Sequence, residues 1–143
     1  MKATVLLKRQ HREVEKLFST ALKTGNENAR RRAMADIVHA LEHHTQIEEE
    51  VFYPAVREIG TKKATDMVGE AYEEHHVVKL VLAELPGVDP SAENFEAKMT
   101  VLKELVGHHV EEEEEEMFPM AERRLGSEHS SELAQEMAGP TAA

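Results

Sequence analysis

Apolar side chains recur every three or four residues along most of this sequence, with polar side chains between them. This spacing places the apolar side chains on one face of an α-helix. Glycines at Gly25 and Gly60 and a Pro-Gly segment at residues 86–90 break the pattern. We therefore predict an all-α protein with helices over residues 2–23, 28–59, 62–85 and 91–125 and a short fifth helix over residues 130–137.

Short connections between the first three predicted helices favour antiparallel neighbours, which is typical of an up-down-up-down four-helix bundle. Pro54 lies late in the second helix and should kink or end it, because proline lacks the amide hydrogen. We expect one bundle domain over residues 1–126, built from two helix pairs. A short helix and a flexible tail are expected over residues 127–143, with the tail beginning at Gly139.

A histidine interrupts the apolar face of each of the four long predicted helices, and a glutamate does so in the second and fourth. Burying an ionisable group costs free energy unless the group is paired or bound to a metal ion. In the second and fourth helices a glutamate follows a histidine by four residues, so both side chains project from one face. The interrupting residues are His11, His44, Glu48, His75, His109 and Glu113.

The same residues form an internal repeat, which relates the first helix pair to the second. At one constant shift along the chain, a histidine, a glutamate and a proline each meet a residue of the same type. The matched pairs are His44 with His109, Glu48 with Glu113, and Pro54 with Pro119; His11 matches His75 at a shift one residue shorter. Since His44 and His75 lie about equally far from the turn at Gly60, all six residues should meet in one layer at mid-bundle.

Composition narrows the chemistry of such a layer. The net charge of −11 disfavours nucleic acid and anionic membranes as partners. The sequence has no cysteine, so a metal ion must be held by His, Asp or Glu, which suits iron, manganese or zinc. Absence of cysteine fits the cytoplasm, the apolar start is too short for a signal peptide, and no apolar run could span a bilayer. We therefore expect a cytoplasmic protein.

A single histidine on an apolar helix face is more often a packing residue than a metal ligand. A doubled set related by a repeat is harder to assign to packing and favours metal binding. Six ligands are too many for one tetrahedral zinc ion. They suit two ions bridged by Glu48 and Glu113, with open positions for a small ligand.

The pattern resembles the hemerythrin-like, HHE cation-binding domain family over residues 3–125. The resemblance rests on His11, on His44 and Glu48 before Phe52-Tyr53-Pro54, on His75, and on His109 and Glu113 before Phe118-Pro119. It implies a four-helix bundle holding a non-haem di-iron centre, with two iron ions bridged by oxo and carboxylate groups. Members of the family carry, store or sense oxygen, handle iron, or act on nitric oxide and peroxide.

Two positions depart from the oxygen-carrying members. Those proteins have a second histidine four residues after the third-helix histidine, where this sequence has Lys79. Their last carboxylate follows its histidine by five residues, which would be Glu114 here, whereas the internal repeat favours Glu113. The resemblance therefore implies binding of, or reaction with, peroxide, nitric oxide or oxygen rather than reversible carriage of oxygen.

Other functions stay open at this point. The alternatives are an inert iron-binding or redox-sensing module without turnover and a purely structural bundle. A ferritin-like oxidase needs Glu-x-x-His on two helices, and only Glu73 with His76 has that form. The expected partners are small oxygen or nitrogen species and a redox partner that the sequence does not identify.

Four further side chains lie near the predicted ligands. Glu15 and Lys79 each follow a ligand histidine by four residues, so we expect them to pair across the bundle, or Glu15 to approach the metal. Tyr53 is expected to be buried near the end of the bundle, and contact between its phenol and the metal layer is the alternative. Glu116 is a further candidate, because it follows His109 by seven residues.

Overall fold

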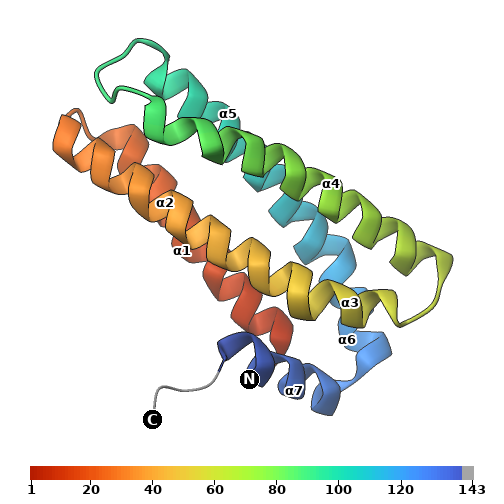
Figure 1. The fold of residues 1–143 in the computed structure, drawn as a ribbon. Coiled ribbons are helices and arrows are strands. Elements are labelled where there is room, and N and C mark those ends of the chain that lie inside the picture. Colours follow the sequence, from red (N-terminus) through yellow and green to blue (C-terminus); the bar gives the residue numbers. More distant parts are fainter. Residues whose placement is uncertain (140–143) are drawn as a thin grey trace.

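The computed structural model describes residues 1–139, and these form four antiparallel helical segments with a fifth helix across one end (Figure 1). The predicted all-α, up-down-up-down bundle is confirmed. The first segment is α1 (Ala3–Lys23), and the second joins α2 (Glu27–Ile47), the π-helical turn η1 (Glu48–Phe52) and α3 (Tyr53–Arg57). The third is α4 (Lys62–Glu84), ending in the 3₁₀ turn η2 (Leu85–Gly87); the fourth joins α5 (Asn94–Glu112), the π-helical turn η3 (Glu113–Met117) and α6 (Phe118–Leu125).

Local sequence explains where the segments begin and end. Asn26 and Thr61 each accept a hydrogen bond from a backbone amide in the first turn of the helix that follows, at 2.9 and 3.1 Å, which satisfies donors that the helix itself cannot. Gly60 and Gly126 adopt φ of +83°, a conformation that glycine reaches without steric cost, and each follows the end of a helical segment. The predicted breaks at these positions are thus present.

The apolar core is divided into two clusters. One contains Phe18, Ile37, Leu82 and Phe95 and fills the half of the bundle that holds the α1–α2 connection. The other fills the opposite half and includes Phe52 and Phe118. The buried histidines and glutamates lie between these clusters, so the layer predicted from the sequence separates the two halves of the core.

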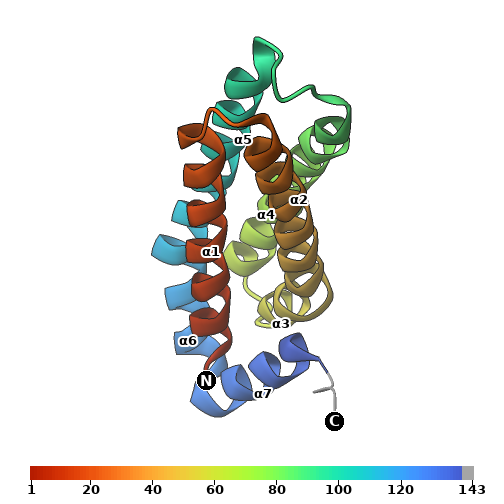
Figure 2. The ribbon, with the colours of Figure 1, turned by 90° about the vertical axis from the view of Figure 1, so that its left-hand side faces the viewer.

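The fifth helix, α7 (Ser127–Ala138), crosses the end of the bundle beside the start of α1 (Figure 2). It begins before the predicted residue 130. The buried Ser130 hydroxyl accepts a hydrogen bond from the Ala3 amide at 3.0 Å and donates one to Glu122 at 2.8 Å. The far end of the predicted tail, residues 140–143, lies outside the described residues.

Candidate metal centre

Four helical segments each bring one histidine to the middle of the bundle, and η1 and η3 bring one glutamate each. All six side chains predicted as ligands are buried, and their residues expose between 0 and 6% of their surface. They are His11 on α1, His44 on α2, Glu48 on η1, His75 on α4, His109 on α5 and Glu113 on η3. The six are thus held by the full length of the chain rather than by one local motif.

The six side chains form two groups that share both glutamates. In each group the ligand atoms lie within 4.8 Å of one another, and each group could hold a metal ion. We call His11, His44, Glu48 and Glu113 the first site, and Glu48, His75, His109 and Glu113 the second site.

Each glutamate faces one histidine of either site. Glu48 Oε1 lies 3.1 Å from the Nε2 atoms of both His44 and His75. Glu113 lies 3.1 Å from His11 Nε2 and 3.2 Å from His109 Nε2, through different oxygens. This is the placement that carboxylates bridging two ions require.

Two buried atoms test whether a metal ion fits. His44 Nε2 lies 3.1 Å from Glu48 Oε1 but is not aligned for a hydrogen bond, and Glu48 Oε2 has no hydrogen-bond partner among the described residues. Leaving such atoms unsatisfied in a protein interior costs free energy. Both atoms are of a kind that binds cations, because one is an imidazole nitrogen and the other a carboxylate oxygen. The residues present therefore fit a pair of metal ions.

The π-helical turns arise from the two prolines that follow the glutamates. Pro54 and Pro119 lack an amide hydrogen, so an ordinary α-helical hydrogen bond is missing at each. The chain instead closes a wider turn, in which the Tyr53 amide bonds to the Glu48 carbonyl and the Phe118 amide to the Glu113 carbonyl. This i to i+5 closure places Tyr53 one turn beyond Glu48 and Phe118 one turn beyond Glu113. The predicted kink at Pro54 therefore takes the form of a widened turn that aims an aromatic ring at the site.

Tyr53 is buried, as expected, but its phenol also reaches the second site, which was the alternative. Its hydroxyl donates a hydrogen bond to Glu113 Oε2 at 2.5 Å and lies 3.2 Å from Glu48 Oε1. It also lies 3.1 Å from the Nε2 atoms of His75 and His109. The repeat places Phe118 at the equivalent position, where its ring stacks on His11 with centroids 5.7 Å apart. The phenol thus distinguishes the two sites.

The outer nitrogen of every ligand histidine is also held by the protein. His11 Nδ1 lies 2.6 Å from Glu114, and His75 Nδ1 lies 2.8 Å from Glu49. A hydrogen bond at Nδ1 fixes the ring and leaves Nε2 free for a metal ion. The other two histidines have the same arrangement, His44 with Gln10 and His109 with Glu74, both at 2.6 Å.

The charged side chains in the layer shift one another's pKa values. Burial alone would lower the pKa of His109, but the Glu113 carboxylate beside it raises that pKa well above the usual value. The pKa of His11 is also raised, because contact with Glu113 outweighs the effect of burial. Burial opposes ionisation of Glu48, yet His44 and the other partners hold its pKa well below normal. Burial and the two glutamates raise the pKa of Tyr53 well above 10. Without metal, protonated His11 and His109 and ionised Glu48 therefore compensate one another.

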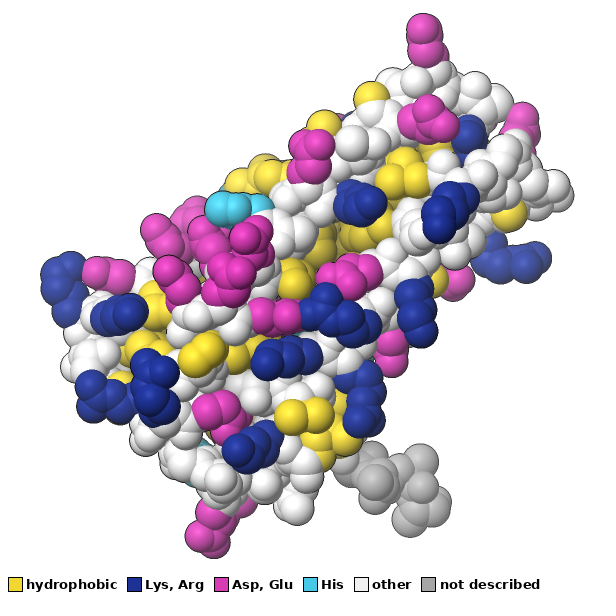
Figure 3. All heavy atoms as spheres, turned by 180° about the vertical axis from the view of Figure 1, so that it is seen from behind, with side chains coloured by type: hydrophobic (Ala, Val, Ile, Leu, Met, Phe, Trp, Pro, Cys, Tyr) yellow, Lys and Arg dark blue, Asp and Glu magenta, His cyan; other side chains and the backbone are white. Residues whose placement is uncertain are grey.

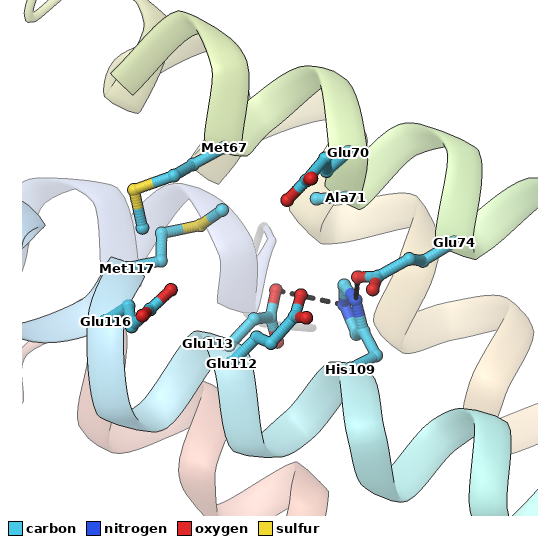
Figure 4. A pocket seen from close by; sticks show the side chains of 9 residues that line it. All are labelled: Met67, Glu70, Ala71, Glu74, His109, Glu112, Glu113, Glu116 and Met117. Atoms are coloured by element: carbon cyan, nitrogen blue, oxygen red, sulfur yellow. Dashed lines mark hydrogen bonds and ion pairs between the residues drawn. The ribbon is translucent and has the colours of Figure 1, made fainter. Parts of the chain in front are cut away.

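Two small cavities, each of about 20 Å³, adjoin the layer. One is lined by all four ligand histidines and by apolar side chains; the apolar ones include Val14, Leu41, Val78, Val106 and Val110. The other lies between α4 and the fourth segment, where Glu70 and Glu74 of α4 lie across from Glu112 and Glu116, beside His109 and Glu113 (Figure 4). One side of the centre is thus apolar, and the other side is acidic.

Glu15 and Lys79 do not pair across the bundle, so that prediction is wrong. Glu15 pairs with Arg12 on the same helix, and its side chain is 53% exposed. Lys79 Nζ lies 2.7 Å from Glu49 Oε2, the oxygen that also contacts His75 Nδ1. Lys79 therefore contacts the centre through Glu49, whereas Glu15 points away from it.

The carboxylates left open by the sequence are now placed. Glu113 rather than Glu114 faces both sites, as the internal repeat favoured, and Glu114 binds the outer nitrogen of His11 and the guanidinium of Arg12. Glu116 lines the acidic cavity without belonging to either ligand group. Sequence reasoning missed Gln10, Glu49 and Glu74. The repeat contained the signal, since it pairs Glu49 with Glu114 and Gln10 with Glu74.

Comparison with known proteins agrees with this geometry. The Hemerythrin HHE cation binding domain matches residues 2–121. The chain belongs to the hemerythrin HHE cation-binding family. No helix within residues 1–139 has the length and apolar character needed to cross a membrane.

Relatives of this hemerythrin-like chain include two curated proteins. One, named a DNA nickase of Nostoc sp., is 28% identical over 131 residues, which are 92% of this chain and 36% of that protein. An uncharacterised hemerythrin-like protein of Schizosaccharomyces pombe is 25% identical over 88% of this chain and 62% of its own. The chain therefore spans less than two thirds of the length of either relative.

A solved structure shares the fold. It is the crystal structure of a hemerythrin HHE cation binding domain-containing protein from Mycobacterium kansasii, with a TM-score of 0.82 and 24% identity. The match covers 96% of this chain and 83% of that one. This likeness supports the hemerythrin-like bundle and, at this identity, nothing finer.

Proposed function

We propose that this protein holds two iron ions and that the loaded centre reacts with hydrogen peroxide. The observation that carries the proposal is the pair of two-histidine sites sharing Glu48 and Glu113. Nitrogen and oxygen donors without sulfur suit iron as well as manganese and zinc, and paired carboxylates between helices, which are typical of di-iron bundles, favour iron. Bound iron would supply the electron exchange by which peroxide is converted to oxygen and water.

The apolar cavity supports a small substrate. A volume of about 20 Å³ is little more than one water molecule needs, which favours small molecules such as peroxide, oxygen and nitric oxide over larger substrates. Each site has four protein ligands, which leaves room for an exogenous one. Position 79 carries a lysine that binds Glu49 instead of a further histidine ligand, which favours a reactive ion over a carrier of oxygen.

The proposal is tested by measuring oxygen release from peroxide. We expect iron-loaded protein to release oxygen, and metal-free protein to release none. A matched solution of free iron, with a chelator present in every sample, corrects for iron that leaves the protein. Loaded protein that binds iron yet releases no oxygen would instead support the inert iron-binding module. Nitric oxide replaces peroxide in a parallel measurement, with loss of the dissolved gas as the readout.

Tyr53 provides a spectroscopic prediction. Its hydroxyl lies within 3.2 Å of all four side chains of the second site, so a cation there would displace the phenolic proton and bind the oxygen. We expect ferric protein to show a visible phenolate-to-iron absorption band that Tyr53→Phe abolishes. Tyr72→Phe is the matched control, because the Tyr72 hydroxyl binds the Glu49 carbonyl outside the ligand groups. An unchanged visible spectrum in Tyr53→Phe contradicts coordination by the phenol.

DNA nicking, the activity named for the Nostoc relative, is not carried over to this chain. The net charge of −11 opposes binding to phosphate backbones, and the match covers 36% of that protein. Seen from behind, acidic side chains gather near the middle of the bundle around an exposed histidine (Figure 3). This surface suits a cation better than a polyanion.

A further inference from the structure

The four ligand histidines form two pairs related by the internal repeat, and the hydrogen-bond partners behind them are of the same type in one pair and differ in the other. His11 and His75, related by the repeat, both contact a glutamate at Nδ1. His44 and His109 are also related by the repeat, but His44 contacts the amide of Gln10, whereas His109 contacts the carboxylate of Glu74. The first site thus has one anionic partner behind its histidines, and the second site has two.

We propose that this difference makes the two sites unequal, so that the second site binds its cation more tightly and fills first, with Gln10 and Glu74 as the positioning residues that set the order. The inference rests on the proposed metal centre. It concerns the order and affinity of loading, on which the proposed reaction itself does not depend.

The physical argument concerns the imidazole Nδ1–H group. A carboxylate acceptor at this hydrogen makes Nε2 more electron-rich and a better ligand, and removal of such a partner typically costs about 10- to 100-fold in metal affinity. A neutral amide accepts the same hydrogen bond but adds no charge. His109 should therefore be a stronger ligand than His44, although both have a partner at 2.6 Å.

The nearby cations preserve this difference of one negative charge. Arg12 binds both oxygens of Glu114, the one carboxylate behind the first site, and so neutralises it. Lys79 neutralises Glu49 in the same way behind the second site. Glu74 has no lysine or arginine partner among the described ion pairs, and His108 approaches it only to 3.9 Å. A net negative charge is left behind the second site alone.

The acidic cavity is a second, independent feature that favours binding of a cation at the second site. It reaches His109 of the second site and the shared Glu113, but neither His11 nor His44 lines it. Glu70, Glu112 and Glu116 also line it (Figure 4), and Glu70 and Glu116 are exposed whereas His109 and Glu113 are buried. A concave acidic surface raises the local concentration of cations. A cation that enters here meets the second site first.

The test uses zinc, a diamagnetic divalent probe, with metal-free protein labelled with ¹⁵N in its histidines. At one equivalent of zinc, we expect the imidazole nitrogens of His75 and His109 to shift before those of His11 and His44. Calorimetry should give two affinities that differ by about tenfold or more. Gln10→Glu should bring the affinities together by strengthening the first site, and Glu74→Gln by weakening the second. The double variant, which keeps the net charge, should reverse the order of filling.

Matched controls separate the hydrogen bond from the added or removed charge. Gln46→Glu adds one negative charge on α2 and Glu73→Gln removes one on α4, both at exposed positions outside the ligand groups. These controls should keep the wild-type order. Equal filling of both sites in the wild type, or an order that the double variant leaves unchanged, overturns the inference. Absence of zinc binding at the six ligands would contradict the metal centre itself, a different outcome from two equal sites.

Discussion

Glu48→Gln should deprive the protein of most of its metal, from two ions per chain to fewer than one at limiting iron. Glu48 faces both sites, so one substitution removes an anionic donor from each ion. Loss of a residue that hydrogen-bonds to a metal ligand already costs about 10- to 100-fold in metal affinity, and loss of a ligand itself should cost more. Metal analysis after gel filtration measures the effect.

Glu50→Gln is the matched control for this substitution. Glu50 lies in the same π-helical turn, but it is exposed and accepts a hydrogen bond from Gln46 at 3.2 Å. Circular dichroism of both variants should show the same helix content. Glu48→Gln protein that retains two ions per chain would rule out Glu48 as the bridge.

Metal removal should lower the melting temperature by roughly 10 °C or more for each site. A ligand that binds only the folded chain stabilises it by about 2.7 kcal/mol when its concentration is 100-fold above its Kd. For a domain of this size, about 1 kcal/mol corresponds to a few degrees. Calorimetric melting of loaded and chelated protein at one pH provides the comparison, and equal melting temperatures contradict it.

The melting difference should also depend on pH. In the metal-free protein the raised pKa values of His11 and His109 give stability that is complete below their ordinary pKa of 6.5 and is lost as pH rises through the folded values. The lowered pKa of Glu48 gives stability that is present above 4.5 and is lost as pH falls through its folded value. Metal-free protein should thus be most stable between about pH 4.5 and 6.5.

Loaded protein does not depend on those protons, because metal binding displaces them. The gap between loaded and metal-free melting temperatures should therefore widen as pH rises above 6.5. A gap that narrows over this interval would show that protonated His11 and His109 do not stabilise the metal-free layer.

The sequence predicted the four segments and all six side chains of the layer because both depend on helical periodicity. His11, His44, His75 and His109 each occupy an apolar face, so packing of that face brings them inside. The ligand choice between Glu113 and Glu114 followed from the repeat, and η3 directs Glu113 inward. A regular spacing along one helix was sufficient for these positions.

Contacts between side chains of different helices were predicted less well. Glu15 and Lys79 are equivalent in the repeat, yet each found a nearer partner of opposite charge, and both remain about half exposed. Pairing inside the core would have cost both ions their hydration, whereas pairing at the surface costs little. For Tyr53 the burial was predicted, but the contact of its phenol with Glu48 depends on the wider turn, which α-helical spacing does not indicate.

The two π-helical turns also change the phase of the helices that contain them. Each turn takes in one more residue than an α-helical turn, so α3 and α6 are rotated relative to α2 and α5 by roughly 100°. In the half of the bundle next to α7, the positions that face the core therefore follow a different helical phase from those in the other half. Deleting a single residue from η1 or η3 would restore one continuous phase and turn Phe52 or Phe118 away from the apolar cluster they fill. In this protein the length of the chain between glutamate and proline is therefore itself a structural constraint, separate from the identity of the residues there.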